Sequence, residues 1–86
     1  MPELSRFYGI VIKMYFADHA PPHFHAEYGD AEALITIETL ATFAGRLPPR
    51  ALGIVTEWAA LHQNELRDAW GKASNLESVE KIDPLP

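Results

Sequence analysis

The sequence contains no cysteine. This absence excludes disulfide bonds and thiolate zinc sites, and it fits a protein of a reducing compartment. Basic residues are also few, because seven lysines and arginines stand against twelve aspartates and glutamates and give a net charge of −5. Affinity for nucleic acid depends on neutralising phosphates, so this balance argues against a large nucleic-acid groove and leaves room only for a small local patch.

Long hydrophobic runs are missing as well. No stretch approaches the roughly 18 apolar residues of a membrane span. The opening residues, MPELSRFYGIVIKMYF, have neither a basic start nor a small-residue cleavage site, so they do not resemble a signal peptide. We therefore expect a cytoplasmic protein that makes no contact with a membrane.

The composition that remains is that of an ordinary globular protein. The chain has 86 residues, of which 48% are hydrophobic and 22% are charged. Its length predicts a single domain over residues 1–86. A domain of this size buries a smaller share of its surface than a larger one, so the core is expected to be thin.

Three segments in the first half of the chain have the pattern of β-strands. The apolar run from Phe7 to Phe16 predicts a largely buried strand. The segment from His23 to Tyr28 alternates in polarity, and the third strand runs from Ala31 to Glu38. Between these two strands, Gly29-Asp30 suits a two-residue type II′ turn.

That turn fixes the register of the second and third strands. It pairs Tyr28 with Ala31 and Phe24 with Ile35, which gives one apolar face. The opposite face then carries His23, His25 and Glu27. Glu27 lies opposite Glu32 in this register, a like-charge pair that something has to neutralise unless the turn is looser.

The second half of the chain is dominated by one predicted helix, in LPPRALGIVTEWAALHQNELRDAWGKA. It opens at Pro48 or Pro49, and its apolar residues recur at steps of three and four. Short strands are expected before it, over 42–45, and after it, over 79–82. The predicted fold class is α+β: a small antiparallel sheet of three to four strands packed on one long C-terminal helix. Its open sheet edges favour a homodimer or a bound partner protein.

Three of the four histidines fall within the segment DHAPPHFHAEYGD. His23 and His25 stand two apart on a strand and therefore project from the same face. His19 could join them where Pro21 and Pro22 bend the chain. Three imidazoles, with Asp18 or Glu27 beside them, would suit zinc or another divalent metal in a site that keeps an open position.

The same rings also fit two other interpretations. Histidine titrates near neutral pH, so His23 and His25 could act as the general base and general acid of a nuclease or hydrolase without a metal. The cluster could also be only the polar face that a one-sided sheet requires. Elsewhere, His62 and Trp58 lie on or beside the apolar stripe of the helix, where a core role is the usual one.

The string Asp18-His19-x-Pro21-Pro22-His23-Phe24-His25 and the later helix resemble the bacterial family called domain of unknown function 4160. The likeness covers nearly the whole chain except TLATFAGR. In the helix the family pattern falls on Arg50, Glu57, Trp58, His62, Leu66 and Trp70.

The resemblance implies a small stand-alone protein without an established activity. Members are often encoded beside a protein of domain of unknown function 2442, an arrangement suggestive of a toxin–antitoxin pair. On that basis we expect a partner-binding accessory protein or toxin-like protein with His19, His23 and His25 as its functional surface. The competing classes are a small metal-dependent or histidine-based nuclease or hydrolase, and a purely structural or regulatory binding domain.

Overall fold

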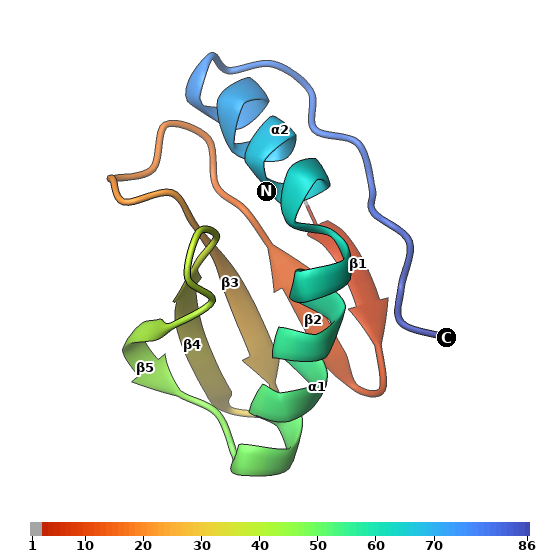
Figure 1. Cartoon of the computed structure of the whole chain (residues 1–86). Helices are drawn as coiled ribbons and strands as arrows, with labels where there is room; N and C mark the ends of the chain where they lie inside the picture. Colours follow the sequence, from red (N-terminus) through yellow and green to blue (C-terminus); the bar gives the residue numbers. More distant parts are fainter. Residues whose placement is uncertain (1–2) are drawn as a thin grey trace.

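A computed structural model describes residues 3–86 of the chain. Five strands form one antiparallel sheet in the order β1-β2-β3-β4-β5, so each strand pairs with the next one along the sequence. Two helices follow the last strand and lie on one side of the sheet (Figure 1). The elements are β1 (Glu3–Phe7), β2 (Ile10–Lys13), β3 (His23–Tyr28), β4 (Ala31–Thr36), β5 (Thr42–Arg46), α1 (Pro49–Leu61) and α2 (Gln63–Ser74). The α+β class is confirmed, whereas the expected count of three to four strands and one helix is wrong.

The first predicted strand is in fact a hairpin. The chain reverses at Tyr8 and Gly9, which both have positive φ angles, of 50° and 80°. Two residues with positive φ are what a type I′ turn requires, and Phe7 pairs with Ile10 across it. The turn was not predicted because apolar residues continue on both sides of the single glycine in the run 7–16.

The β3–β4 hairpin has the predicted register. Tyr28 pairs with Ala31, Phe24 with Ile35, and Glu27 with Glu32. Gly29 has a φ of +59°, a value that L side chains rarely adopt, so a glycine suits the first position of this turn. Because the register is correct, the division of β3 into one apolar and one polar face is confirmed as well.

The core lies between the apolar face of the sheet and the helices. Trp58 of α1 is fully buried, and its ring packs against Phe7 at 5.3 Å and Phe24 at 6.1 Å between centroids. Tyr28 also lies on this face, near the end of the sheet, and remains 42% exposed beside Pro48 and Ile54. The helix therefore covers the centre of the sheet more completely than its end.

The predicted long helix is broken at His62. This residue has φ −126° and ψ 25°, which are not helical angles, and it separates α1 from α2. Beside the break, the Gln63 side chain donates a hydrogen bond to the carbonyl of Ile37, at 2.9 Å. The break was not predicted because the apolar periodicity continues across it. Leu66 and Ala69 of α2 are buried in the same core as the apolar residues of α1.

The last residues form a tail beside β1 in place of the expected strand over 79–82 (Figure 1). The Ile82 N–H donates to the Leu4 carbonyl at 2.7 Å, and the Trp58 indole N–H donates to the Asp83 carbonyl at 2.8 Å. Tyr8 donates its hydroxyl hydrogen to the carbonyl of Pro86. The tail thus covers the β1 edge of the sheet. In the part of the chain that the structure describes, neither helix has the length and apolarity to cross a membrane.

Candidate functional site: a histidine–carboxylate cluster

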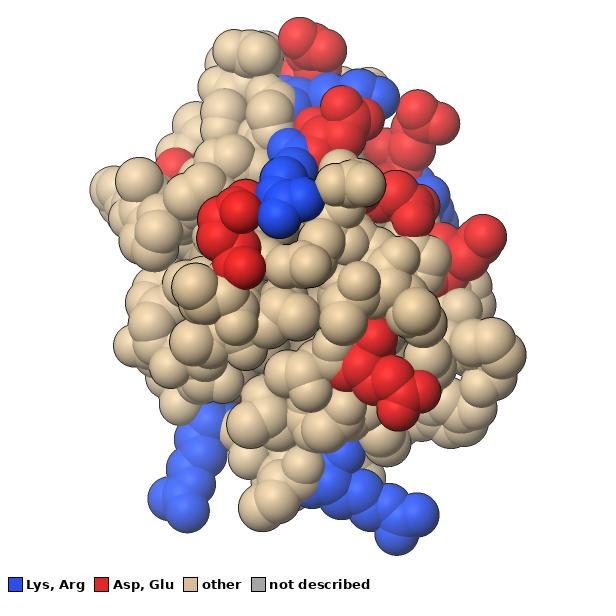
Figure 2. All heavy atoms as spheres, in the orientation of Figure 1, with Lys and Arg blue, Asp and Glu red and all other residues tan. Residues whose placement is uncertain are grey.

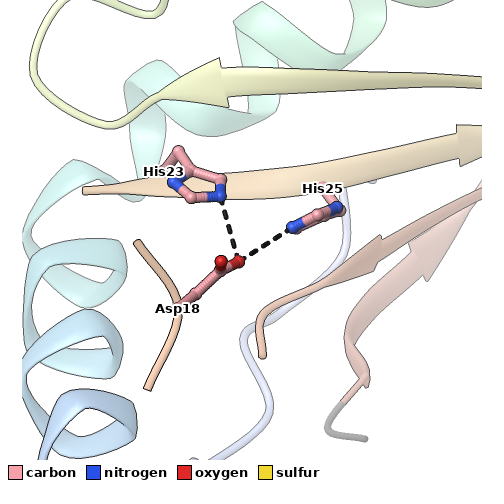
Figure 3. Close-up of side chains that lie close together, drawn as sticks. All are labelled: Asp18, His23 and His25. Carbon is pink, nitrogen blue, oxygen red and sulfur yellow. Dashed lines mark hydrogen bonds and ion pairs between the residues drawn. The ribbon is translucent and has the colours of Figure 1, made fainter. Parts of the chain in front are cut away.

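Two histidines and one aspartate meet on the polar face of the sheet (Figure 3). His23 and His25 project from β3, and Asp18 comes from the loop that joins β2 to β3. Asp18 Oδ2 lies 3.1 Å from His23 Nε2 and 3.2 Å from His25 Nε2. The three candidate ligand atoms lie within 4.8 Å of one another. A single carboxylate oxygen therefore faces both rings.

The loop that supplies Asp18 is fixed at both of its ends. The Ala17 N–H donates to the carbonyl of Ala73 at the end of α2, and the Ile37 N–H donates to the carbonyl of Pro22. Within the loop, the His19 N–H donates to Asp18 Oδ1 at 2.8 Å, which leaves Oδ2 facing the rings. The fold of the loop, and not strand alternation, places the carboxylate.

His23 is almost fully enclosed, with 3% of its surface exposed. Its ring lies 5.2 Å from the rings of Phe43, Trp70 and His25. The Tyr15 ring packs edge-on against the His25 ring, with 4.4 Å between the ring centroids. Aromatic side chains from three other segments thus restrict the orientation of both imidazoles.

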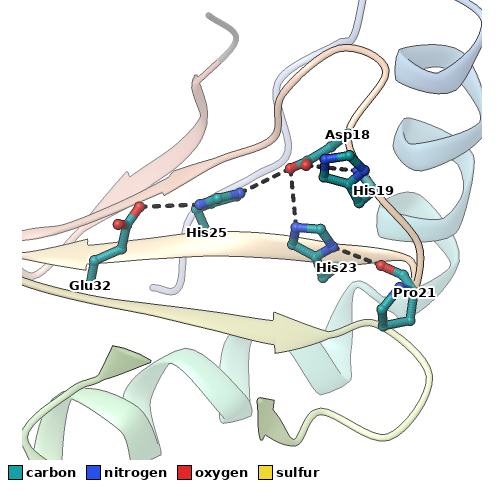
Figure 4. Close-up of polar contacts among 6 residues, drawn as sticks. All are labelled: Asp18, His19, Pro21, His23, His25 and Glu32. Carbon is teal, nitrogen blue, oxygen red and sulfur yellow. Dashed lines mark hydrogen bonds and ion pairs between the residues drawn. The ribbon is translucent and has the colours of Figure 1, made fainter. Parts of the chain in front are cut away.

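The other nitrogen of each ring has its own acceptor (Figure 4). His23 Nδ1 lies 2.7 Å from the carbonyl oxygen of Pro21. His25 Nδ1 lies 3.1 Å from Glu32 Oε2. Both acceptors lack hydrogens, so each bond requires the proton to sit on Nδ1. In the neutral rings both Nε2 atoms then carry lone pairs directed toward Asp18.

Electrostatics keeps Asp18 ionised. Partial burial opposes its charge, but the bond from the His19 N–H, the bond that His25 donates when its ring is protonated, and the positive charge that either ring carries when protonated outweigh it and lower the pKa of Asp18. The site therefore holds an ionised carboxylate beside two imidazole rings within one small volume.

The structure brings together only part of the predicted residue set. His23 and His25 share the site, and Asp18 takes the place beside them that was expected of His19. His19 is exposed, and its ring contributes no atom to the cluster. Glu27 is engaged elsewhere, because its carboxylate lies 3.1 Å from Lys13 Nζ.

The candidates on the helices do not reach the cluster. Arg50 and Glu57 line a shallow groove on α1 together with Tyr8, and Trp58 belongs to the core. His62 packs against Trp58 and forms a short contact with Glu65 of α2. Among residues 3–86, none of these four candidates contributes a ligand atom to the group around Asp18.

Sequence reasoning missed Glu32 as a member of the site. The predicted hairpin register held the signal for it. His25 pairs with Leu34, and Glu32 is the next residue of β4 on the same face. Diagonal neighbours of this kind lie within reach of a long side chain. The predicted register therefore already implied that Glu32 lies within reach of His25.

The described residues on the face that carries α1 and α2 show a mixture of acidic and basic side chains (Figure 2). Figure 2 shows acidic and basic side chains interspersed on the face that carries α1 and α2, and its basic groups do not gather into one patch. The described residues on this face thus agree with the acidic composition of the chain.

The fold and the site together define a small α+β domain with a histidine–carboxylate cluster on the polar face of its sheet. The chain belongs to the family described as Domain of unknown function (DUF4160), whose model matches residues 9–71. The match includes Asp18, His23, His25 and Glu32, whereas β1 and the C-terminal tail lie outside it. No curated protein and no solved structure matches the chain.

Proposed function

We propose that this protein binds a divalent metal ion such as zinc through Asp18 Oδ2, His23 Nε2 and His25 Nε2. Two imidazoles and one carboxylate are a common ligand set for ions of this class. Three protein ligands leave at least one position for water, which is the arrangement of a catalytic site rather than of a closed structural one.

The observation that carries this proposal is the unpartnered Nε2 atom of His23. The bond to the Pro21 carbonyl holds the ring proton on Nδ1, so Nε2 is an acceptor in the neutral ring. It is buried and makes no aligned hydrogen bond, although Asp18 Oδ2 lies only 3.1 Å away. A buried nitrogen lone pair that faces a carboxylate oxygen is repelled by it, and a cation between the two removes the repulsion.

The spacing of the ligand atoms agrees with such an ion. Ligand atoms about 2.0–2.1 Å from a tetrahedral zinc ion stand about 3.3 Å from one another. The distances from Asp18 Oδ2 to the two rings are 3.1 Å and 3.2 Å. The two imidazole nitrogens lie within 4.8 Å of each other, so the approach of the two rings is the adjustment that would admit the ion.

A metal held in this way would also supply chemistry. An ion with an open position lowers the pKa of a bound water and polarises a bound substrate oxygen, so hydrolysis is the reaction class to test first. The competing form of the site carries protons in place of the metal. A protonated His25 would donate to both Asp18 and Glu32, and the pair of histidines would then act as an acid and a base.

Calorimetric titration of protein purified without a histidine tag distinguishes these two forms. We expect zinc, and to differing degrees manganese and nickel, to bind with a stoichiometry of about one per chain, because the chain offers one cluster of this kind among its described residues. His23→Ala, His25→Ala and Asp18→Ala should each abolish binding, since two remaining ligands rarely hold zinc.

His19→Ala is the matched control. It removes a histidine from the same loop, and its ring lies outside the cluster, so binding should persist. Circular dichroism of each variant would establish that the fold is intact. Absence of heat and of thermal stabilisation with all three metals would end the metal proposal and leave either the acid/base form of the site or a plain polar face of the sheet.

The partner and toxin-like roles implied by the family resemblance stay predictions. A protein of domain of unknown function 2442 type and a second copy of the chain are the two partners to test, by co-purification and by light scattering. Growth arrest on expression of the wild type, relieved in a His23→Ala, His25→Ala double variant, would support a toxin-like role that depends on the cluster.

A further inference from the structure

Among residues 3–86, Glu32 is the one charged side chain that contacts the Nδ1 atom of a cluster histidine. Its Oε2 atom lies 3.1 Å from His25 Nδ1, on the side of the ring opposite Asp18. The two residues come from neighbouring strands, β3 and β4, in a register that makes them diagonal neighbours. The His25 side chain is 13% exposed and that of Glu32 is 44% exposed, so the bond forms at the border between the site and the solvent.

The charges around Glu32 leave it available for His25. Its cross-strand neighbour Glu27 is paired with Lys13 at 3.1 Å. Arg46 is the register partner of Glu32 on β5, but the ion pairs within residues 3–86 give Glu32 only His25 as a basic partner. Within these residues, the Glu32 carboxylate therefore interacts with the His25 ring and not with several basic side chains.

We infer that Glu32 is a positioning residue that fixes the proton of His25 on Nδ1 and so presents the Nε2 lone pair to the metal. The inference rests on the proposed metal site. An imidazole that donates through one nitrogen to a carboxylate is both oriented and made a stronger ligand through the other nitrogen. Without Glu32 the neutral ring could place its proton on Nε2 and donate it to Asp18, which would block coordination.

The two rings of the cluster are thus fixed by different means. His23 donates to a main-chain carbonyl, that of Pro21, which no side-chain substitution removes. His25 depends on a side chain from the neighbouring strand. A substitution at Glu32 can consequently change the proton position of His25 without altering a ligand.

The test compares Glu32→Ala, Glu32→Gln and the control Glu27→Gln in zinc-binding titrations. Glu32→Ala should weaken zinc binding by about 10- to 100-fold, the usual cost of losing such a partner. Glu32→Gln should restore most of the affinity, because its amide oxygen still accepts the Nδ1 hydrogen. Glu27→Gln changes the same charge on the same face without touching a histidine, and its affinity should equal that of the wild type.

A second readout does not depend on metal. Nitrogen NMR of the metal-free protein at a pH where His25 is neutral reports which ring nitrogen carries the proton. We expect the proton on Nδ1 in the wild type and in Glu32→Gln, and a shift toward Nε2 in Glu32→Ala. This measurement needs no variant to interpret the wild type, so it stays informative if Glu32→Ala folds poorly.

The outcomes separate the two proposals. If the wild type binds no metal, the proposed function fails, while the proton position still confirms or refutes the role of Glu32. If the wild type binds zinc and Glu32→Ala binds it equally well, the positioning role is wrong. If Glu32→Gln loses as much affinity as Glu32→Ala, Glu32 acts through its charge or as a ligand, and the inference is overturned.

Discussion

The two faces of β3 are built from alternate residues of one strand, and they are held by different kinds of interaction. Phe24 and Ala26 point into the core and are fully buried against apolar neighbours such as Trp58. His23 and His25 point the other way and contact individual oxygen atoms of Asp18, Pro21 and Glu32. Apolar burial has no preferred direction, so many arrangements would close the first face. The polar face, by contrast, requires each ring nitrogen to lie at hydrogen-bond or ligand distance from one particular oxygen atom.

The polar face also shows how a local conflict is removed by its surroundings. Glu27 and Glu32 stand directly opposite each other, and like charges in that position destabilise a hairpin. Lys13 of β2 pairs with Glu27, and His25 of β3 pairs with Glu32. Each carboxylate thus has its own partner, and the contact that Glu32 makes belongs to the candidate site.

The largest effect on stability is expected from a substitution on the apolar face. Phe24→Ala should lower the free energy of unfolding by about 3–5 kcal/mol, because a fully buried aromatic side chain leaves a cavity. Urea denaturation followed by circular dichroism measures this loss. A variant within about 1 kcal/mol of the wild type would show that the core does not depend on this face.

Leu66→Ala extends the same test to α2. Leu66 is fully buried, and its truncation should cost about 2–5 kcal/mol. If α2 unfolds separately from the sheet, hydrogen exchange would rise in α2 and remain low in α1. A variant that melts like the wild type would contradict the assignment of α2 to the common core.

Bound metal is expected to stabilise the folded chain by an amount that grows with the free metal concentration. If zinc binds only the folded chain, a free concentration of about 100 times its Kd raises the free energy of unfolding by about 2.7 kcal/mol. Thermal melts with and without zinc give this value, and a chelator should reverse it. Asp18→Asn should show no such gain, and an equal gain in both proteins would place the bound metal elsewhere.

The smallest expected effect concerns Lys13. Its hydrogen bond to Glu27 raises the pKa of Lys13, so the folded state binds this proton more tightly than the unfolded state. The stabilisation is therefore complete below the ordinary lysine pKa of about 10.4 and is lost as pH rises through the higher value of the folded state.

Lys13→Met keeps most of the apolar stem and removes the charge. It should lower the melting temperature slightly at neutral pH, and the difference should shrink in high salt and at alkaline pH. Differential scanning fluorimetry across a salt series is sufficient. A difference that is unchanged by salt would show that Lys13 acts through packing and not through its charge.

The features that depend on neighbours along the chain could be predicted from the amino-acid sequence. Alternation over His23 to Tyr28 and a glycine at position 29 set the β3–β4 register, and the register divided His23 and His25 from Phe24. Residues of one strand, and strands joined by a two-residue turn, have few alternative arrangements, so local rules are enough. The same rules contained the contact between His25 and Glu32.

Tertiary structure decided the parts for which local patterns offered equivalent choices. The apolar run 7–16 suited one strand as well as a hairpin, and the helical periodicity continued across His62 without marking the break. Asp18 and His19 are adjacent and both suit a metal, and the loop that turns Asp18 toward the rings is docked against Ala73 of α2. That contact joins residues 56 positions apart, between Ala17 and Ala73, and no local pattern specifies it because it exists only once the sheet and the helices have packed together.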